Sequence, residues 1–310
     1  MTAVAVHAAK QKRTPKKRRV KRDWRGWLFV GPFMFFFLLV FIAPLVYAIY
    51  LSLFQPDMVW GVAQGEKFVG FENYVTLFND PKFWSGVKGV ALFLVIQVPI
   101  MLGISLFLAL ALDSGRLWGT KFFRVSVFLP YAIPSVVATL MWGFLYGTRY
   151  GVLASFNNAF GTSIDFFTHG LIWVGIGNIV TWLYIGYNML IMYSTLKTIP
   201  HSLYEAAVID GANEFDIIRA IKLPALRGSL MITIIFSIIG TFQLFNEPNV
   251  MQQMSNNVIT SHFTPNFYAF HLAFEAHSPH YSAALAIVMG LITVVVAYVV
   301  QLWGARGDQK

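Results

Sequence analysis

Two small groups of aromatic and amide side chains lie within segments that are otherwise apolar. One group is Tyr184, Tyr187 and Asn188, and the three-residue spacing of the tyrosines puts them on one face of a helix. The other is Gln243 and Asn246, which have the same spacing. Aromatic faces, hydroxyls and amides bind uncharged polyhydroxy molecules such as sugars. These residues predict a site for such a solute, although the same residue types also anchor helices at membrane interfaces and join helices together.

Catalytic and metal chemistry find little support in the sequence. The chain has no cysteine, no Gly-x-x-x-x-Gly-Lys-Ser/Thr loop and no His-Glu-x-x-His motif. Four histidines share the stretch 247–281, but they lack the spacing of a compact ligand pair. They are His262, His271, His277 and His280. We therefore expect no enzyme activity, no metal site and no cofactor bound by this chain.

The composition indicates that most of the chain lies in a membrane. Hydrophobic residues make up 57% of the 310 residues and charged residues 12%, whereas about 25% of a soluble domain is charged. Six segments without Asp, Glu, Lys or Arg are long enough to cross a bilayer as helices. They are 28–54, 89–112, 125–147, 170–196, 229–246 and 282–303. The sequence thus predicts an all-α polytopic membrane protein with six transmembrane helices.

The residues inside these segments indicate the shape of the helices and the energy source of any transport. Prolines in the first and third segments predict kinks there: Pro32, Pro44, Pro130 and Pro134. Ion-coupled transporters use ionisable groups inside the membrane, and the six segments contain no Asp, Glu, Lys, Arg or His. Any solute movement would then be passive or driven by a separate partner.

The distribution of Lys and Arg predicts the orientation. Residues 1–25 form a basic tail with ten of the 23 Lys and Arg, and we expect it to bind anionic membrane lipid rather than nucleic acid. The N-terminal side of the predicted membrane carries 19 of these residues and the opposite side four. Because positive loops stay in the cytoplasm, both termini are expected there.

The loop 197–227 reads as helix, turn, helix. Ser202 with Glu205, and Asn213 with Asp216, have the spacing of capping boxes at the starts of the two helices. Gly211 supplies a turn between the helices, and Pro224 is expected to end the second one. The small residues Ala206 and Ala207 would let the first helix approach another surface closely. The alternative is a loop that merely connects two membrane segments.

This loop resembles the signature of permease subunits of ATP-binding-cassette (ABC) importers. The matching residues are Glu205-Ala206-Ala207, Asp210-Gly211-Ala212 and Ile221-Lys222-Leu223-Pro224. Within this signature, Asp210-Gly211-Ala212 favours the carbohydrate branch of the family. The resemblance extends over most of the chain, which is similar to the maltose permeases. It includes Gly70-Phe71-Glu72-Asn73-Tyr74, Leu129-Pro130-Tyr131-Ala132-Ile133-Pro134 and Phe242-Gln243-Leu244-Phe245-Asn246. Unlike the maltose permease, this chain has only six predicted spans and a short first outer loop.

The resemblance implies a type I importer core, residues 26–310, in the cell membrane. It implies a second, related permease, two cytoplasmic ATPase subunits that bind the ATP, and an extracytoplasmic sugar-binding protein. The residues implied to couple to an ATPase are Glu205, Ala206, Ala207, Asp210, Gly211, Leu223 and Pro224. The sugar-contacting positions fall on Leu183, Tyr184, Tyr187, Gln243 and Asn246, with Asn188 added from the cluster above.

Two alternatives to sugar import remain open from the sequence. One is another polar solute, such as a glycerol phosphate. The solute can differ from that of the maltose permease, because Val180 stands where that permease has Asn. An uncoupled channel or membrane scaffold is the other.

Overall fold

The computed structural model describes residues 25–59, 62–255 and 258–307. The chain divides into two compact units, Met1–Tyr47 and Ala48–Lys310, which are considered separately. All but the last residue of the predicted basic tail lie outside the described residues.

The first predicted span is a continuous helical segment. It consists of α1 (Arg25–Phe37), a π-helical turn η1 (Leu38–Ile42) and α2 (Ala43–Ser52), the last of which crosses the boundary between the units. Residues Gly26–Ser52 have a mean hydropathy of 2.5. The π turn precedes Pro44, which has no N–H to donate to the preceding turn, so a local change of hydrogen-bond pattern is expected there.

Four long helices form the frame of the second unit. They are α4 (Pro81–Asp113), α8 (Ile172–Leu196), α12 (Arg227–Phe242) and α15 (Pro279–Gly307). α4 packs along α8, and α12 packs against both α4 and α15. One face of α8 buries Ile176, Ile179 and Leu183 in a core that also contains Phe93 of α4.

The third predicted span is broken rather than kinked. It consists of α5 (Thr120–Phe128), a 3-10 turn η2 (Leu129–Ala132) and α6 (Ser135–Leu145), and the two arms meet at 99°. Ile133 precedes Pro134 and is extended, as the steric demand of a following proline requires. Among the described residues, five helices could therefore cross a membrane, or six if this bent pair counts as one span.

Glycine allows α5 to lie very close to α8. A Cβ placed on Gly186 of α8 would stand 2.1 Å from the carbonyl oxygen of Val127 and 2.6 Å from Cα of Phe128. Since no side chain could fit there, the small residue fixes how α5 meets the long helix.

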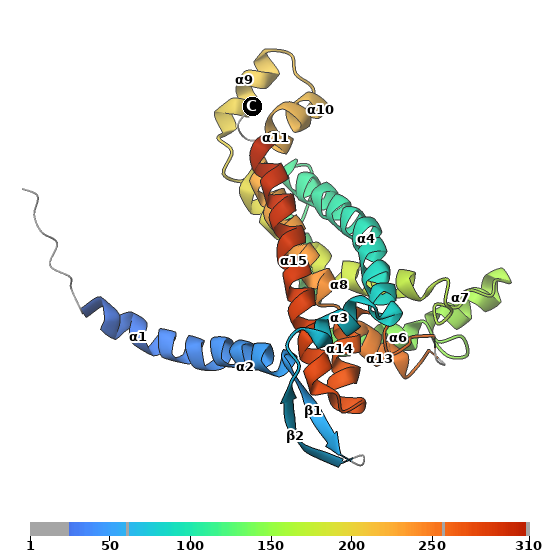
Figure 1. The fold of residues 1–310 in the computed structure, drawn as a ribbon. Coiled ribbons are helices and arrows are strands. Elements are labelled where there is room, and N and C mark those ends of the chain that lie inside the picture. The colour runs from blue at the N-terminus through green and yellow to red at the C-terminus, as the bar shows by residue number, and fades with distance from the viewer. Residues whose placement is uncertain (1–24, 60–61, 256–257, 308–310) are drawn as a thin grey trace, which may run out of the picture. The chain divides into compact units, whose positions relative to one another are not determined.

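Shorter elements occupy the two ends of the second unit, as Figure 1 shows. At one end are α9 (His201–Ile209), α10 (Glu214–Ile217), the π turn η3 (Ile218–Lys222) and α11 (Leu223–Ala225). Towards the other are an antiparallel hairpin, β1 (Phe54–Val59) with β2 (Val62–Phe68), and helices α3 (Glu72–Phe78), α7 (Val152–Phe160), α13 (Asn246–Gln252), α14 (Pro265–Phe270) and η4 (His271–Glu275). The hairpin is a small addition to the expected all-helical fold.

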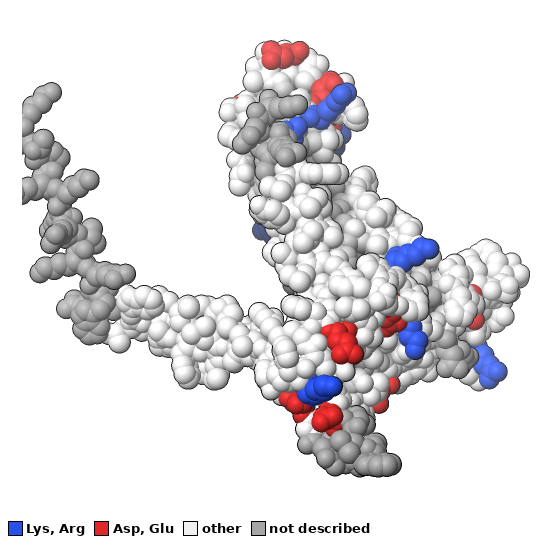
Figure 2. Space-filling view, in the orientation of Figure 1, with Lys and Arg blue, Asp and Glu red and all other residues white. Residues whose placement is uncertain are grey.

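On the face in Figure 2, charged side chains gather at both ends, and the surface along α15 between them is largely uncharged.

Candidate functional site

A cavity of about 390 Å³ lies among α4, α8, α12 and the chain turn that follows α12. Its polar wall consists of uncharged groups and one carboxylate. These residues are Gln97, Tyr131, Ser135, Tyr184, Tyr187, Asn188, Ser237, Thr241, Gln243, Asn246 and Glu247. A concave site of mixed aromatic and hydrogen-bonding character is the usual setting for a small polar ligand.

The structure brings five of the six predicted solute-contacting residues into this one cavity: Tyr184, Tyr187, Asn188, Gln243 and Asn246. The exception is Leu183, whose side chain is 3% exposed and packs in the hydrophobic core instead. It precedes Tyr184 directly, so helical geometry turns it about 100° away from the cavity.

Aromatic contacts hold the tyrosines in place. The ring of Tyr187 stacks on Tyr131 with centroids 4.7 Å apart, and Tyr184 meets the same Tyr131 edge-on at 6.0 Å. Tyr131 lies in η2, at the break between α5 and α6. The broken span thus positions a third tyrosine ring in the cavity wall.

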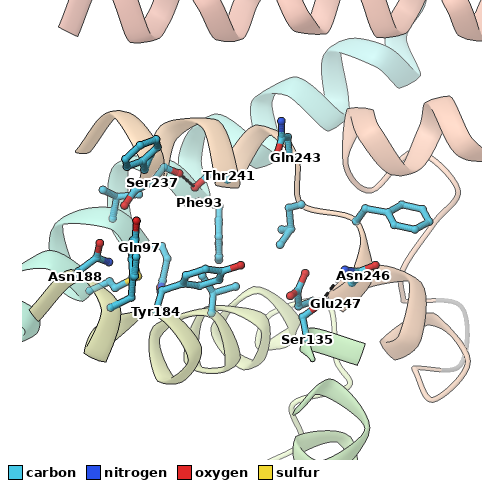
Figure 3. A pocket seen from close by; sticks show the side chains of 18 of the residues that line it. Phe93, Gln97, Ser135, Tyr184, Asn188, Ser237, Thr241, Gln243, Asn246 and Glu247 are labelled. Atoms are coloured by element: carbon cyan, nitrogen blue, oxygen red, sulfur yellow. Dashed lines mark hydrogen bonds between the residues drawn. The ribbon is translucent and has the colours of Figure 1, made fainter. Parts of the chain in front are cut away.

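Figure 3 shows Gln97 and Asn188 on one side of Tyr184, and Glu247 and Asn246 on the other. The Asn246 side-chain amide donates a 2.8 Å hydrogen bond to the Ser135 hydroxyl. This bond joins α13 to α6 across the edge of the cavity.

The sequence analysis did not predict six of the polar cavity residues, among them Gln97 and Glu247. Gln97 of α4 is an amide within an apolar segment, and its Nε2 donates to the carbonyl oxygen of Gly177 at 2.8 Å and to the hydroxyl of Thr181. Glu247 is only 6% exposed and lines the cavity, although no ionisable group was expected in the spans. The fifth predicted span ended at Asn246, whereas the apolar helical segment runs over Arg227–Gln252 and includes Glu247.

The loop 197–227 is a helix, turn and helix, as predicted, but its first cap is different. Asn213 and Asp216 form the expected capping box, and Gly211 has the left-handed φ of +83°. Ser202 is not an N-cap, because α9 already begins at His201, directly after the extended Pro200. Glu205 instead pairs with His201, with Oε1 and Nδ1 3.1 Å apart.

Pro224 does not end the second helix. Helical conformation continues through α11 to Ala225, and the π turn η3 comes just before this proline. A π turn is one way to accommodate the carbonyl group that proline leaves without a donor.

The outer surface of α9 and α10 is exposed and partly apolar. Side-chain exposure is 49% for Leu203, 61% for Val208, 85% for Ile209 and 67% for Phe215. Glu205, Ala206, Asp210 and Gly211 are exposed on the same loop. An exposed apolar patch with polar residues around it is typical of a protein-binding surface.

A bent helical membrane core with an internal polar cavity and a protruding helix-turn-helix loop is the architecture of a solute permease. Residues 101–309 match the family of binding-protein-dependent transport system inner membrane components. The chain belongs to this family, and it is therefore a membrane-embedded transport component and not an enzyme.

The similarity to relatives extends over nearly the whole chain, and a solved structure shares the fold. A lactose transport system permease of Rhizobium radiobacter is 32% identical over 304 residues, which cover 94% of this chain and 98% of that protein. A probable starch degradation products permease of Thermoanaerobacterium thermosulfurigenes is 26% identical over 282 residues, 88% of this chain and 91% of that one. A chain of the bacterial alginate ABC transporter, solved with its alginate-bound periplasmic protein, has the same fold, with a TM-score of 0.80 at 17% identity over 92% of this chain and 95% of that one.

Proposed function

We propose that this chain is the permease subunit of an ABC importer for a neutral sugar or oligosaccharide. The observation that carries the proposal is the composition of the cavity wall. It offers aromatic faces, hydroxyls, amides and one carboxyl group, and no Lys or Arg is among the described residues that line it. Such a wall suits neutral hydroxyl groups.

The charge of the cavity also separates the two solute classes considered from the sequence. A glycerol phosphate would bring an anionic phosphate into a cavity whose described lining residues include no Lys or Arg to compensate its charge, next to the buried side chain of Glu247. Because burying an anion without an opposite charge beside it is costly, a neutral solute is favoured. The names of the lactose and starch-product relatives point the same way.

The loop 197–227 supplies the coupling surface in this proposal. The apolar patch on α9 and α10 would enter a cleft of a cytoplasmic ATPase subunit, with Glu205 next to a basic residue there. Ala206 and Ala207 keep that side of α9 small. A second, related permease would complete the cavity, two ATPases would bind the ATP, and an external binding protein would deliver the sugar. Both termini would lie in the cytoplasm, as the distribution of Lys and Arg suggests.

The test is uptake into proteoliposomes that contain the complete importer. Labelled lactose, maltotriose and glycerol 3-phosphate are offered with ATP, and again with an ATPase subunit that cannot hydrolyse it. We expect ATP-dependent uptake of a neutral sugar and none of glycerol 3-phosphate. Uptake that proceeds equally without hydrolysis would identify a channel, and preferred uptake of glycerol 3-phosphate would overturn the neutral-sugar assignment.

A further inference from the structure

Two ion pairs centred on the buried carboxylate of Asp113 lie where the loop 197–227 meets the ends of α4 and α8. The Asp113 carboxylate binds two ammonium groups, with Oδ1 2.9 Å from Nζ of Lys197 and Oδ2 3.0 Å from Nζ of Lys222. The side chains of Asp113 and Lys222 are 5% and 6% exposed, whereas that of Lys197 is 52% exposed. This burial distinguishes the Asp113–Lys222 pair from surface ion pairs, which contribute little to stability.

Each of the three residues comes from a different part of the fold. Asp113 is the last residue of α4, Lys197 directly follows α8, and Lys222 is the last residue of η3 in the loop. A carboxylate at the C-terminal end of a helix is unfavourable by itself, because the carbonyl groups there carry partial negative charge. The two lysines therefore stabilise a negative charge that the dipole of α4 disfavours.

The docking helix α9 contacts the same group. The Tyr204 ring lies beneath the Lys222 ammonium at 5.4 Å, and its hydroxyl is buried without a hydrogen-bond partner among the described residues. Burial raises the pKa of Tyr204, so the phenol is neutral. α9 is thus packed onto Lys222, which is in turn bound to Asp113.

The helices that Asp113 joins are also the helices that wall the cavity. α4 contributes Gln97 and α8 contributes Tyr184 to its lining. A displacement of α9 that carried Lys222 with it would pull on both helices at once.

We propose that Asp113 is a positioning residue for coupling: its paired ion bridges make the loop 197–227 move as one body with the ends of α4 and α8. The inference rests on the proposed function, in which the loop docks on an ATPase. It assigns the transmission of that movement to a buried carboxylate outside both the docking surface and the cavity.

The test compares two variants that remove ion pairs from the same region. Asp113→Asn keeps the shape of the side chain and removes the buried charge. Arg116→Gln breaks the Arg116–Glu214 pair, whose side chains are 76% and 41% exposed. Glu214 also lies 3.7 Å from Lys222, so this variant alters the exposed edge of the same group of charges. It leaves Asp113 and both of its lysines in place and is therefore the matched control. The chain has no cysteine, so spin labels can be placed on introduced cysteines alone, one at Ala220 in η3 and one at Ile104 in α4.

The measurement is the distance between these labels in the complete importer, without nucleotide and with ATP and vanadate. In the otherwise unchanged chain and in Arg116→Gln, we expect the distance to stay constant while the ATPase cycles. In Asp113→Asn we expect ATP hydrolysis to continue while the distance shifts with nucleotide, on the order of the 5 Å of one helical turn. Because no sugar is needed, failure of this test is distinguishable from failure of the sugar assignment.

Two outcomes would overturn the inference. One is a constant distance in Asp113→Asn, and the other is a nucleotide-dependent distance already present in the unchanged chain. If Asp113→Asn does not assemble, the double variant Asp113→Asn with Lys222→Gln is measured in the same way, because it also removes the buried Lys222 ammonium, whose remaining ion-pair partner is Glu214 at 3.7 Å. Assembly failure of both variants would assign the pair to folding and would also overturn the proposal.

Discussion

The Asn246 side-chain amide and the Ser135 hydroxyl are 2.8 Å apart, although 111 residues separate them in the chain. Both line the cavity, so this bond ties the turn after α12 to the start of α6. Asn246 can therefore have one of two roles: it binds the solute, or it links α13 to α6.

Two alanine variants separate these roles. We expect Asn246→Ala to weaken ATP-driven sugar uptake by about 2- to 10-fold, the cost of one hydrogen bond, with normal assembly. Ser135→Ala removes the link and leaves the amide free to bind solute, so its effect on uptake should be smaller. Uptake affinity and the yield of assembled complex are measured for both. Equal loss of assembly in the two variants would show that Asn246 is a structural link.

Close packing of α5 on α8 gives a stability prediction. Gly186→Ala would force a Cβ against the Val127 carbonyl and should destabilise the permease by about 1–3 kcal/mol. Gly103→Ala in α4 has nothing within 4 Å of its Cβ and is the control, expected to be neutral or to stabilise by about 0.5–1 kcal/mol. Thermal unfolding of the purified protein checks both. Similar melting temperatures for the two variants would contradict the close contact.

Asp80 gives a pH-dependent prediction. It precedes α4, caps it through the N–H of Lys82, and accepts 2.8 Å hydrogen bonds from the hydroxyls of Tyr268 and Tyr281. Burial raises the pKa of Asp80, but these hydrogen bonds outweigh it and hold the pKa below the ordinary value of 3.8. A lowered pKa means that the stabilisation is complete above 3.8 and is lost as the pH falls through the pKa of the folded state.

The measurement is the difference in melting temperature between the unchanged protein and Asp80→Asn. We expect the difference to be constant near neutral pH and to shrink in acid below about pH 4. Tyr268→Phe removes one of the two hydroxyl donors to Asp80. In the Tyr268→Phe background, the difference in melting temperature between Asp80 and Asp80→Asn should be smaller but still present. A difference that does not depend on pH would contradict a stabilising ionised Asp80.

Local patterns predicted the parts of this structure that depend on neighbouring residues. The spacing of Tyr184 and Tyr187 placed both in one cavity, because helical periodicity alone decides which face they share. The capping box of Asn213 and Asp216 is likewise local. Ser202 failed as a cap because the N-cap is Pro200 and the helix begins at His201, two residues earlier than a cap at Ser202 would place it.

Features that depend on distant contacts were not predictable from one sequence. Glu247 enters the cavity because the chain turns after α12 and brings α13 against α6 and α8. The requirement that a predicted span contain no Asp, Glu, Lys or Arg ended the fifth span at Asn246 and so placed Glu247 outside the membrane. The 99° break between α5 and α6 follows the prolines, but its size depends on how the two arms pack on the rest of the fold.

Glu205 tests the docking surface. It is not a helix cap here, since its side-chain partner is His201. If Glu205 meets a basic residue of the ATPase, Glu205→Gln should weaken that interface by about 2–5 kcal/mol and detach the ATPase. His201→Gln removes the intrahelical partner and serves as the control. Retention of the ATPase by Glu205→Gln, measured by copurification, would show that the charge is not needed.

The account depends most on the cavity being the path of the solute, and a single cysteine tests this directly. The chain has no cysteine of its own, so the rate at which a water-soluble thiol reagent modifies Gln243→Cys reports access to the cavity in the complete importer. Phe274→Cys, at an exposed side chain outside this cavity, is the control. We expect the transported sugar to slow modification of Gln243→Cys and to leave Phe274→Cys unchanged. Equal rates at Gln243→Cys with and without the sugar, under conditions of active uptake, would contradict the assignment of this cavity to the transport path.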